Sequence, residues 1–579
     1  MKKMFSLLLC AALLAGCSNT VTEVTPVTQP PAETIPAQQV VEYIAPAYVS
    51  RFDAVTEITL SDSGITVDGP EETDAVFTSN DILYYEDRDT YDSGNPYGEG
   101  TGDDKHSADE AAAHTVVNIT APGAYRVTGK LSAGQLRIDL GEDAFADPDA
   151  VVELILSDAD ITCTVAPAIL FLNTYECDNS WSVDTAKADV DTTAAGANLI
   201  LEGSSTVNGS YVAKIFKDKE GEKKLWKQDG AVYSYMSLNV FGPGSLELNA
   251  ANEGLDTELH LTINGGNIII NSDNDGINTN EDGVSVTTFN GGSLTIHAGL
   301  GAEGDGIDSN GYLVINGGTV VSAAKPMADA GLDSDLGSFI HGGTVIAMGS
   351  TMDWAESDSR QVTMNLQFAR QQAAGSKITI TREDGTQIFS FVDDGSNARG
   401  FSGLILSHPN FRQGETYHVY VDGVQMAYTG TDVAGFPGGF GGRPGGMGGM
   451  PEDFDPETMP EGFEPGQMPE GFDPSQMPEG FDPSQMGGGR GQRPADEERT
   501  PPEGFDPGQM PEGFGNFDPE NMPEGFRPEN IPEGFAPGQM PEGMAPPEGS
   551  GQDNRQSGEA STEFYMNDTV NAFSGITNA

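Results

Sequence analysis

The sequence predicts an all-β fold, a parallel β-helix in which the chain winds into stacked coils. The main observation is a repeat in the middle of the chain, because Gly-type turns recur every 25 or 26 residues. These turns contain Gly266, Gly292, Gly318 and Gly343. The second observation is a recurring four-residue motif of the form Gly-(Ile/Leu)-(Asp/Asn)-(Ser/Thr), called the acidic phrase below. It begins at Gly254, Gly276, Gly306 and Gly331. The repeats contain no run with a 3.6-residue period, which excludes a helical solenoid.

The first 16 residues are predicted to be a lipoprotein signal peptide. Lys2 and Lys3 precede an apolar run that is too short to span a bilayer as a mature helix. The small residues before Cys17 resemble a bacterial lipoprotein cleavage box, which implies that Cys17 carries a lipid anchor on the outer face of the cell membrane. An ordinary signal peptide with a chance cysteine is the alternative. Residues 17–50 are rich in Thr, Pro and Gln, which predicts a flexible tether.

Residues 51–361 are predicted to form the β-helix. In the segment LTINGGNIIIN, Leu261 and Ile263 face the same side as Ile268 and Ile270, which follow the turn. The same apolar positions return in the later repeats, so each side chain should stack on its counterpart about 4.8 Å away. Sandwich strands would not repeat their sequence in register. Two segments interrupt the pattern: residues 84–113 are predicted to be a long loop, and residues 214–228 a lysine-rich hairpin.

The rest of the chain divides into three parts. Residues 362–432 contain hairpin patterns with Asp-Gly turns, which predicts a β cap over the open end of the stack. Residues 433–560 are of low complexity, rich in Pro, Gly and Met, and are expected to be disordered. Residues 561–579 regain apolar side chains and are a possible returning strand.

The charge of the chain limits its partners. The 89 acidic residues against 28 basic ones give a formal net charge of −61, which makes nucleic acid an unlikely partner because phosphate binding needs a basic face. The lysine-rich hairpin is either a solvated protrusion or a contact for an anionic partner. Cys163 and Cys177 could form a disulfide in an exported protein or remain two buried thiols. A monomer is expected.

Strand alternation places the third residue of each acidic phrase in one outer column. Two carboxylates one coil apart repel by about 3 kcal/mol at an effective dielectric of 20, and Ca²⁺, which takes six to eight oxygen ligands, would reverse that repulsion. An Asp/Asn ladder bonded to the backbone is the competing interpretation. The predicted calcium ligands are Asp256, Asp273, Asp275, Asn278, Asp305, Asp308, Asp329, Asp333 and Asp335.

Several segments together carry a family resemblance over about residues 55–430. They are ADIT followed by APAIL, residues 229–234 with LNVFGPGSLEL, the NGG and DGI(D/N)(S/T) repeats, the hairpin cap and the Gly/Pro/Met-rich tail. The series resembles the bacterial cell-surface carbohydrate-binding β-helix family of clostridia and their relatives. The resemblance implies a right-handed parallel β-helix with bound calcium, similar in fold to family 9 polysaccharide lyases. It also implies binding of cellulose-like and pectin-like polymers. The lysine-rich hairpin and the long acidic loop depart from the pattern.

Three functions are compatible with the sequence. The first is a noncatalytic polysaccharide-binding lipoprotein, with Tyr235, Tyr312 and Trp354 as candidate sugar platforms, although each could serve the core or the cap instead. The second is a calcium-dependent, pectate-type lyase that uses Lys325 as the base. Lys325 could equally be a loop residue paired with Asp329. The third is a structural or adhesion protein of the cell surface.

Overall fold

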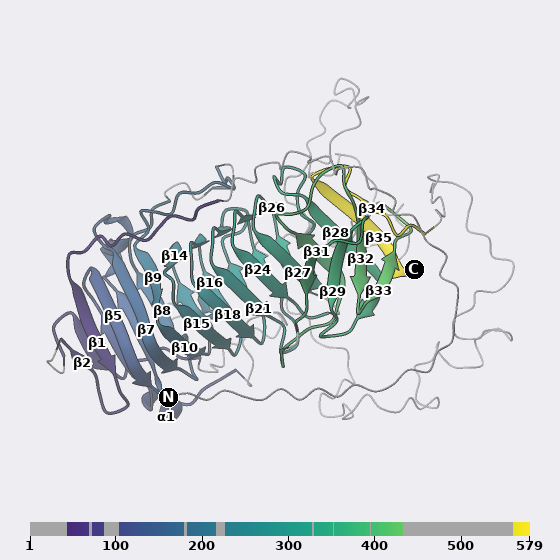
Figure 1. Cartoon of the computed structure of the whole chain (residues 1–579). Helices are drawn as coiled ribbons and strands as arrows, with labels where there is room; N and C mark the ends of the chain where they lie inside the picture. Colours follow the sequence, from purple (N-terminus) through teal and green to yellow (C-terminus); the bar gives the residue numbers. More distant parts are fainter. Residues whose placement is uncertain are drawn as a thin grey trace, which may run out of the picture. The chain divides into compact units, whose positions relative to one another are not determined.

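The computed structural model describes residues 43–68, 72–85, 104–178, 182–183, 185–215, 226–326, 329–350, 353–393, 395–431 and 560–579. About half of these residues belong to β-strands, which form long, largely parallel sheets consistent with a parallel β-helix (Figure 1). No helix in this part of the chain is long and apolar enough to cross a bilayer.

One sheet contains nine strands, which pair in parallel apart from the antiparallel pair β3–β4. Each acidic phrase contributes one of its strands. The sheet comprises β3 (Val76–Ser79), β4 (Thr115–Ile119), β6 (Gly134–Asp139), β8 (Ile169–Asn173), β13 (Gly230–Ser234), β16 (Glu253–Thr257), β19 (Ile277–Thr279), β22 (Ile307–Ser309) and β25 (Leu332–Ser334).

A 24-stranded sheet supplies the other walls of the stack. It begins with β1 (Val55–Leu60), β2 (Thr66–Val67), β5 (Gly123–Leu131) and β7 (Val152–Thr162). Two parallel columns continue from β7, which pairs with one through Val152–Ser157 and with the other through Asp160–Thr162. The columns separate beside Asp158, whose φ is 55°.

The two columns contain one strand each from every later coil. The first consists of β9 (Ala197–Glu202), β14 (Leu238–Phe241), β17 (Leu261–Ile263), β20 (Val286–Phe289), β23 (Tyr312–Ile315) and β26 (Gly337–Ile340). The second consists of β10 (Ser204–Gly209), β15 (Ser245–Ala250), β18 (Asn267–Ser272), β21 (Ser293–His297), β24 (Thr319–Ala323) and β27 (Thr344–Gly349). Strands β16, β17 and β18 therefore make one coil, and β19, β20 and β21 make the next.

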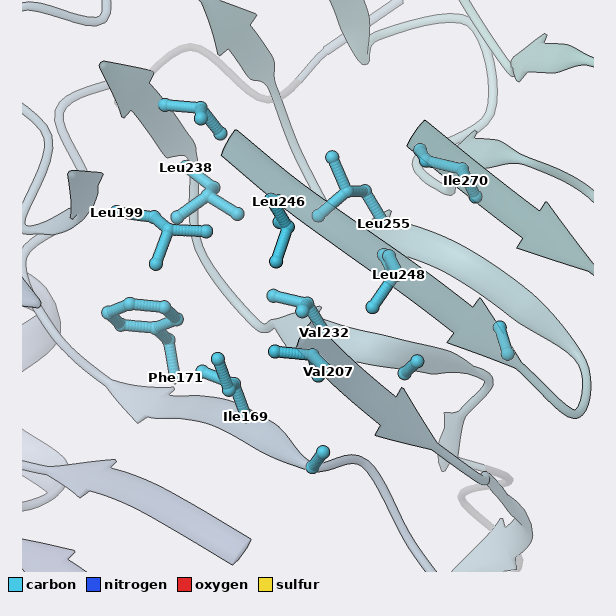
Figure 2. Packing of buried hydrophobic residues seen from close by; sticks show 14 of the residues in the cluster. Ile169, Phe171, Leu199, Val207, Val232, Leu238, Leu246, Leu248, Leu255 and Ile270 are labelled. Carbon is cyan, nitrogen blue, oxygen red and sulfur yellow. The ribbon is translucent and has the colours of Figure 1, made fainter. Parts of the chain in front are cut away.

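The apolar repeat builds the core in the register that the sequence predicts. Leu246 pairs with Ile268, Ile268 with Leu294, and Leu294 with Val320. All four are almost fully buried. Figure 2 shows side chains from both sheets, such as Val232 and Leu248, pointing into one shared interior. Each coil therefore buries its apolar side chains against those of its neighbours, as a stacked repeat must.

The glycines that begin the acidic phrases are required by the close approach of successive coils. A Cβ atom on Gly254 would lie 2.4 Å from the carbonyl oxygen of Gly276, and a Cβ atom on Gly276 would lie 2.5 Å from that of Gly306. On Gly306 the same atom would lie 2.4 Å from the carbonyl oxygen of Gly331. Backbone atoms cannot move aside without disturbing the ladder, so the repeat keeps glycine at this position.

We expect Gly276→Ala to lower the free energy of unfolding by about 2 kcal/mol or more, because the new methyl group also overlaps Ile296. Gly395→Ala is the matched control, since its Cβ atom would meet nothing closer than 3.5 Å. Thermal melting of the two variants measures the effect. Equal midpoints would show that the coils separate easily enough to admit a methyl group.

The cap is a set of antiparallel hairpins that includes the C-terminus. Its strands are β28 (Thr363–Gln372), β29 (Ile378–Arg382), β30 (Gln387–Phe391), β31 (Phe401–Ser407), β32 (Thr416–Val421), β33 (Val424–Ala427), β34 (Phe564–Tyr565) and β35 (Val570–Asn578). β31 pairs with β27, which joins the cap to the last coil. β35 pairs in parallel with β28 and antiparallel with β33. The expected returning segment, residues 561–579, thus contains two strands. The low-complexity tail lies almost entirely outside the described residues.

The segment that precedes β1 lies against the body, which differs from the predicted tether boundary at residue 50. We call residues 43–54 the N-terminal strap. Tyr48 lies 5.2 Å from Phe241 between ring centroids, and Arg51 N–H donates to the buried carboxylate of Glu153 at 2.8 Å. Ala45 is within reach of a Cβ atom on Gly291, and Tyr43 of one on Gly317. The strap therefore crosses several coils.

The predicted long loop has more structure than expected, whereas the lysine-rich segment pairs as its hairpin pattern predicts. The long loop contains helix α1 (Ala108–Ala112), which begins with a capping box between Ser107 and Glu110, whereas residues 86–103 lie outside the described part. The lysine-rich segment forms an antiparallel pair, β11 (Val212–Ile215) with β12 (Trp226–Gln228). A short 3₁₀ helix, η1 (Glu142–Ala146), precedes β7. Cys163 and Cys177 are both free thiols.

Candidate functional site

The acidic phrases stack in the predicted register along the nine-stranded sheet. Asp256 pairs with Asn278, Asn278 with Asp308, and Asp308 with Asp333. The hydroxyl residues that follow them point into the stack, where Thr279 Oγ1 and Ser309 Oγ lie 2.9 Å apart. The outer column is less open than strand alternation suggests. Asp256 has no exposed surface, and the other three side chains are half-buried.

Three carboxylates gather at the first coils of this column. Asp229 precedes β13, Glu253 begins β16, and Asp256 lies three residues further on. Burial raises the pKa of Asp229 to about 6, although Lys227 Nζ lies 3.2 Å from its Oδ2 atom and opposes the shift. Burial, followed by repulsion from neighbouring acids, raises the pKa of Glu253 and of Asp256 well above the usual range. One lysine therefore offsets only part of the negative charge that the fold brings together here.

Among the described residues, three buried oxygens in this cluster have no hydrogen-bond donor in normal geometry. They are Oε2 of Glu253, Oδ2 of Asp256 and Oδ1 of Asn278. Asp256 Oδ1, in contrast, accepts a hydrogen bond from Asn280 Nδ2 at 2.7 Å. Unpaired buried acceptors are costly, and unpaired buried carboxylates more so. Carboxylate and amide oxygens are the ligands that Ca²⁺ prefers, so these residues fit the predicted cation in chemical type.

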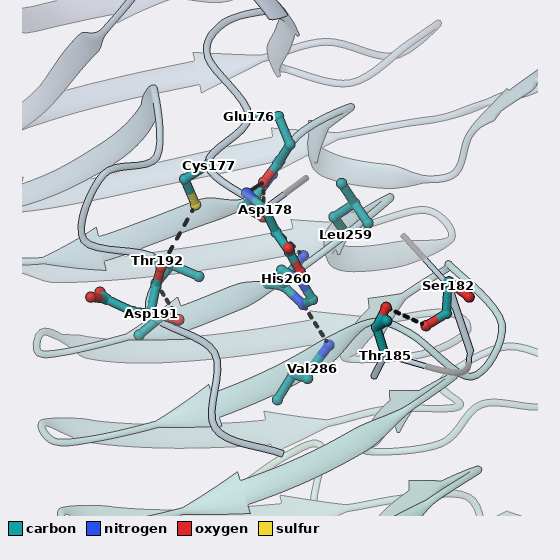
Figure 3. A network of polar contacts seen from close by, with 12 residues as sticks. Glu176, Cys177, Asp178, Ser182, Thr185, Asp191, Thr192, Leu259, His260 and Val286 are labelled. Carbon is teal, nitrogen blue, oxygen red and sulfur yellow. Dashed lines mark hydrogen bonds and ion pairs between the residues drawn. The ribbon is translucent and has the colours of Figure 1, made fainter. Parts of the chain in front are cut away.

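A second buried acid in the same fold shows the contrast. Glu176 (Figure 3) is fully buried. Its carboxylate accepts hydrogen bonds from Ser237 N–H at 2.7 Å and from Ser237 Oγ at 3.0 Å. The neighbouring Asp178 lies 3.1 Å from His260 Nε2. His260 Nδ1 accepts the N–H of Val286, so the ring proton resides on Nε2 and is donated to Asp178. Buried acids elsewhere in the stack thus receive donors from the protein itself.

Further along the stack, three other predicted ligands, which precede the phrase glycines, accept hydrogen bonds from backbone N–H groups of neighbouring coils. Asp275 Oδ1 accepts the N–H of Asp305 at 2.6 Å, and Asp305 Oδ1 accepts the N–H of Ala330. Asp329 Oδ2 accepts the N–H of Gly304 at 2.9 Å. Burial raises the pKa of Asp275 and of Asp305 well above the usual range, so these ladder rungs also favour a proton or a cation. Both interpretations of the acidic column therefore apply, but to different coils.

The remaining predicted ligands do not converge. Asp273 and Asp335 are exposed, and Asp333 Oδ1 accepts the N–H of Ser334 at 3.1 Å. Across the described residues, no group of three or more His, Cys, Asp or Glu side chains is arranged to hold a metal ion. A cation at Glu253 and Asp256 would therefore need amide, backbone or water oxygens to complete its coordination.

Two residues of the cluster were missed by the sequence analysis. Lys227 is the last lysine of the hairpin, and Asp229 follows it closely in the chain. The available signal was the register of the repeat, because Gly230, like Gly254, follows an acidic residue at the start of a phrase-like strand. Lysine spacing alone did not show that the root of the hairpin lies beside the acidic column.

The candidate base Lys325 is engaged by the backbone. Its Nζ atom donates to the carbonyl oxygens of Gly301, at 2.9 Å, and of Ala302. Asp329 instead accepts a hydrogen bond from the N–H of Gly304. The hydrogen bonds of Lys325 are therefore to backbone carbonyls and not to Asp329, which was the alternative partner. Lys325 therefore stabilises the turn that contains Gly301 and Ala302.

The three candidate sugar platforms occupy different environments. Tyr235 is half-buried, accepts a hydrogen bond from Gln228 Nε2 at 3.2 Å and meets Tyr233 edge-on. Tyr312 lies in the 24-stranded sheet, with its ring 6.1 Å from Phe339. Trp354 packs against the main core. The structure does not bring these rings together as one platform.

Comparisons with known proteins found a family model, a curated relative and a solved structure. A family model described as a carbohydrate-binding domain-containing protein matches residues 113–404. A protein of that description from Acetivibrio thermocellus is 29% identical over 189 residues, which are 30% of this chain and 56% of the relative. The chain thus spans little more than half of that relative's length. A solved structure of a polysaccharide lyase-like protein from C. thermocellum, a gadolinium derivative, is 18% identical and covers 50% of this chain and 93% of its own, with a TM-score of 0.29.

Proposed function

Because this chain belongs to the family of carbohydrate-binding domain-containing proteins, we propose that it is a noncatalytic lipoprotein that binds polysaccharide at the bacterial cell surface. The polymer is cellulose-like or pectin-like, and the binding body is a right-handed parallel β-helix loaded with calcium. Two observations support the proposal: the long stack of parallel strands, and the buried oxygens on one of its walls that have no hydrogen-bond donor among the described residues.

The unpaired oxygens of Glu253, Asp256 and Asn278 carry the calcium part of the proposal. The side chains of Glu253, Asp256 and Asn278 would hold the ion, with backbone or water oxygens completing its coordination, and the ion would offset the repulsion between these acids and the nearby Asp229. Bound calcium would supply a positive charge that a uronic acid carboxylate can share. Lys227 supplies a positive charge at this place through its pair with Asp229. The straight wall of in-register strands would then orient an extended glycan along the stack.

A calcium-dependent lyase remains the alternative, and a structural or adhesion protein the second alternative. Proton abstraction needs a base that is free to approach the substrate. Lys325 donates to two carbonyl oxygens, and Lys227 is paired with an acid. This arrangement favours binding over chemistry.

The test uses the full chain with polygalacturonate and with cellulose, each with calcium and with EGTA. Retention is followed by pull-down, and lyase product by the ultraviolet absorbance of its unsaturated bond. We expect calcium-dependent retention without product. Asp256→Asn should weaken retention, whereas Asp273→Asn, which changes an exposed acid, should not. Product that disappears in Lys325→Ala would establish the lyase. Neither retention nor product would leave the structural alternative.

The membrane anchor rests on Cys17, which lies outside the described residues. We expect wild-type protein to sediment with the membrane fraction of producing bacteria and Cys17→Ala to appear in the soluble fraction, because several acyl chains anchor a protein firmly whereas an unmodified segment does not. Immunoblots of the two fractions measure this. Equal distribution of the two proteins would contradict lipidation.

A further inference from the structure

A loop of the cap reaches back onto the coil stack. It spans residues 392–400, between β30 and β31. Asn397 Nδ2 donates to Asn271 Oδ1 at 2.8 Å, and Asp393 Oδ2 lies 3.3 Å from His297 Nε2. Asn271 belongs to β18 and His297 to β21, so the loop is fastened to two successive coils. The side chains that it carries are therefore held in fixed positions relative to the stack.

The loop lies at the end of a column of amide side chains. Asn208 Nδ2 donates to Thr162 Oγ1 at 3.0 Å, and Asn249 Nδ2 donates to Asn208 Oδ1 at the same distance. Asn271 Nδ2 continues the column by donating to Asn249 Oδ1 at 2.9 Å. These amides are half-buried and follow the axis of the stack from coil to coil. They form a polar ridge that ends at the loop.

Arg399, near the end of this loop, forms no ion pair with a carboxylate among the residues that the structure describes. Its Nε and Nη2 atoms are buried without a hydrogen-bond acceptor, and burial lowers the pKa of its guanidinium. Other arginines meet carboxylates: Arg126 lies 2.6 Å from Glu57, and Arg382 lies 3.0 Å from Glu415.

This contrast is informative because the chain has 89 acidic residues and only 28 basic ones. Carboxylates are abundant, yet no described carboxylate pairs with Arg399. Buried donors without acceptors destabilise the folded state, so an external acceptor that filled this position would be bound favourably. The planar guanidinium matches the two oxygens of a carboxylate better than any other anion-binding side chain does.

We propose that Arg399 is a subsite for the carboxylate of an acidic polysaccharide, with the neighbouring amide ridge contacting the sugar hydroxyls. The inference rests on the proposed function and assigns it a uronic-acid polymer in place of a neutral glycan. The subsite lies beside β18 and β21 of the 24-stranded sheet, whereas the proposed calcium ligands lie on the nine-stranded sheet.

The test compares Arg399→Gln with Arg370→Gln, which removes the same charge from an exposed position on the cap strand β28. Binding of the full chain to polygalacturonate and to cellulose is titrated with calcium present. We expect Arg399→Gln to raise the Kd for polygalacturonate about tenfold or more, the change typical of losing a charged hydrogen bond, and to leave cellulose retention unchanged. Arg370→Gln should stay close to wild type. Arg399→Lys keeps the charge but loses the planar pair of donors of the guanidinium, and its Kd for polygalacturonate should be intermediate.

The outcomes separate the two proposals. If Arg399→Gln and Arg399→Lys both bind polygalacturonate like wild type, while EGTA abolishes binding, the subsite is wrong and the proposed function stands. If wild type binds cellulose but not polygalacturonate, the same conclusion follows. If wild type binds neither polymer, the proposed function itself fails. Melting curves identify any variant that fails to fold, in which case Arg399→Lys carries the comparison.

Discussion

Removal of divalent cations is expected to lower the midpoint of thermal unfolding at neutral pH by about 5 °C or more. Asp229, Glu253 and Asp256 are buried together with one lysine, and an ion that binds them only in the folded state stabilises that state by about 4 kcal/mol at a thousandfold excess over its Kd. Calorimetry with calcium and with EGTA measures the shift. An unchanged midpoint would leave the backbone ladder as the whole account of the acidic column.

The same acids give metal-free protein a pH dependence of definite sign. Burial raises the pKa of Asp229 to about 6 and raises those of Glu253 and Asp256 well above their usual range, whereas unfolded acids titrate at about 4. The folded state therefore binds protons more tightly, and its stability falls as pH rises from about 4 through the folded pKa values. Metal-free protein should melt higher at about pH 5 than at pH 7, and calcium should reduce the difference. Asp81 and Asp393 have lowered pKa values and act in the opposite direction, but only in more acidic solution.

Asp256→Asn provides an internal check, because it removes the buried charge and keeps the shape of the side chain. It should raise the melting midpoint without metal at neutral pH and diminish the gain from calcium. Asp273→Asn should alter neither quantity, since Asp273 is exposed. If Asp256→Asn instead destabilises the metal-free protein, the charge of Asp256 is compensated in the folded state and the argument for a cation at this place fails.

The second large effect concerns the C-terminus. Deletion of residues 561–579 removes β34 and β35 and with them four nearly fully buried side chains, Phe564, Met566, Phe573 and Ile576. Each contributes about 1.5–3 kcal/mol on burial, so the cap should lose its cooperative unfolding and become sensitive to protease. Melting and limited proteolysis of the truncated chain measure this.

The matched control keeps β34 and β35 and removes the segment that connects β33 to β34. Tyr428 and Ser561 exchange two backbone hydrogen bonds of 2.9 Å, so the two ends of that segment lie side by side. Replacing residues 433–559 by a short flexible linker should therefore leave the cap transition in place. If the truncated chain and wild type melt alike, β35 contributes little to the cap.

The stacking of the coils could be predicted from sequence because its cause is local and repeated. Leu246, Ile268, Leu294 and Val320 occupy the same position after each turn, and a one-residue slip would turn all of them outward. The division of the 24-stranded sheet into two columns could not be predicted, because it depends on a single bend beside Asp158. The position of the N-terminal strap was also missed, since its contacts with Phe241 and Glu153 are distant in sequence.

The candidate site was only partly predictable for a related reason. Alternation correctly placed Asp256, Asn278, Asp308 and Asp333 in one column, but it says nothing about what covers them. The cover over Asp256 includes Asn280, which donates to it, and Tyr233, its neighbour in the adjoining strand. Whether an acidic side chain accepts a backbone N–H or has no donor depends on the path of the next turn. Glu253 and Asp305 both precede the glycine of an acidic phrase, yet their hydrogen bonds differ, because Glu253 Oε2 has no donor among the described residues whereas Asp305 Oδ1 accepts the N–H of Ala330.

The N-terminal strap determines how force would enter the molecule. Its contacts place Tyr43 near Gly317, well along the stack, before the chain returns to β1. If Cys17 is anchored as proposed, tension between the envelope and a captured polymer would arrive at the flank of the body. The load would shear the Tyr48–Phe241 and Glu153 contacts together before it reached the first coil. A tether joined directly to β1 would instead peel that terminal strand one hydrogen bond at a time.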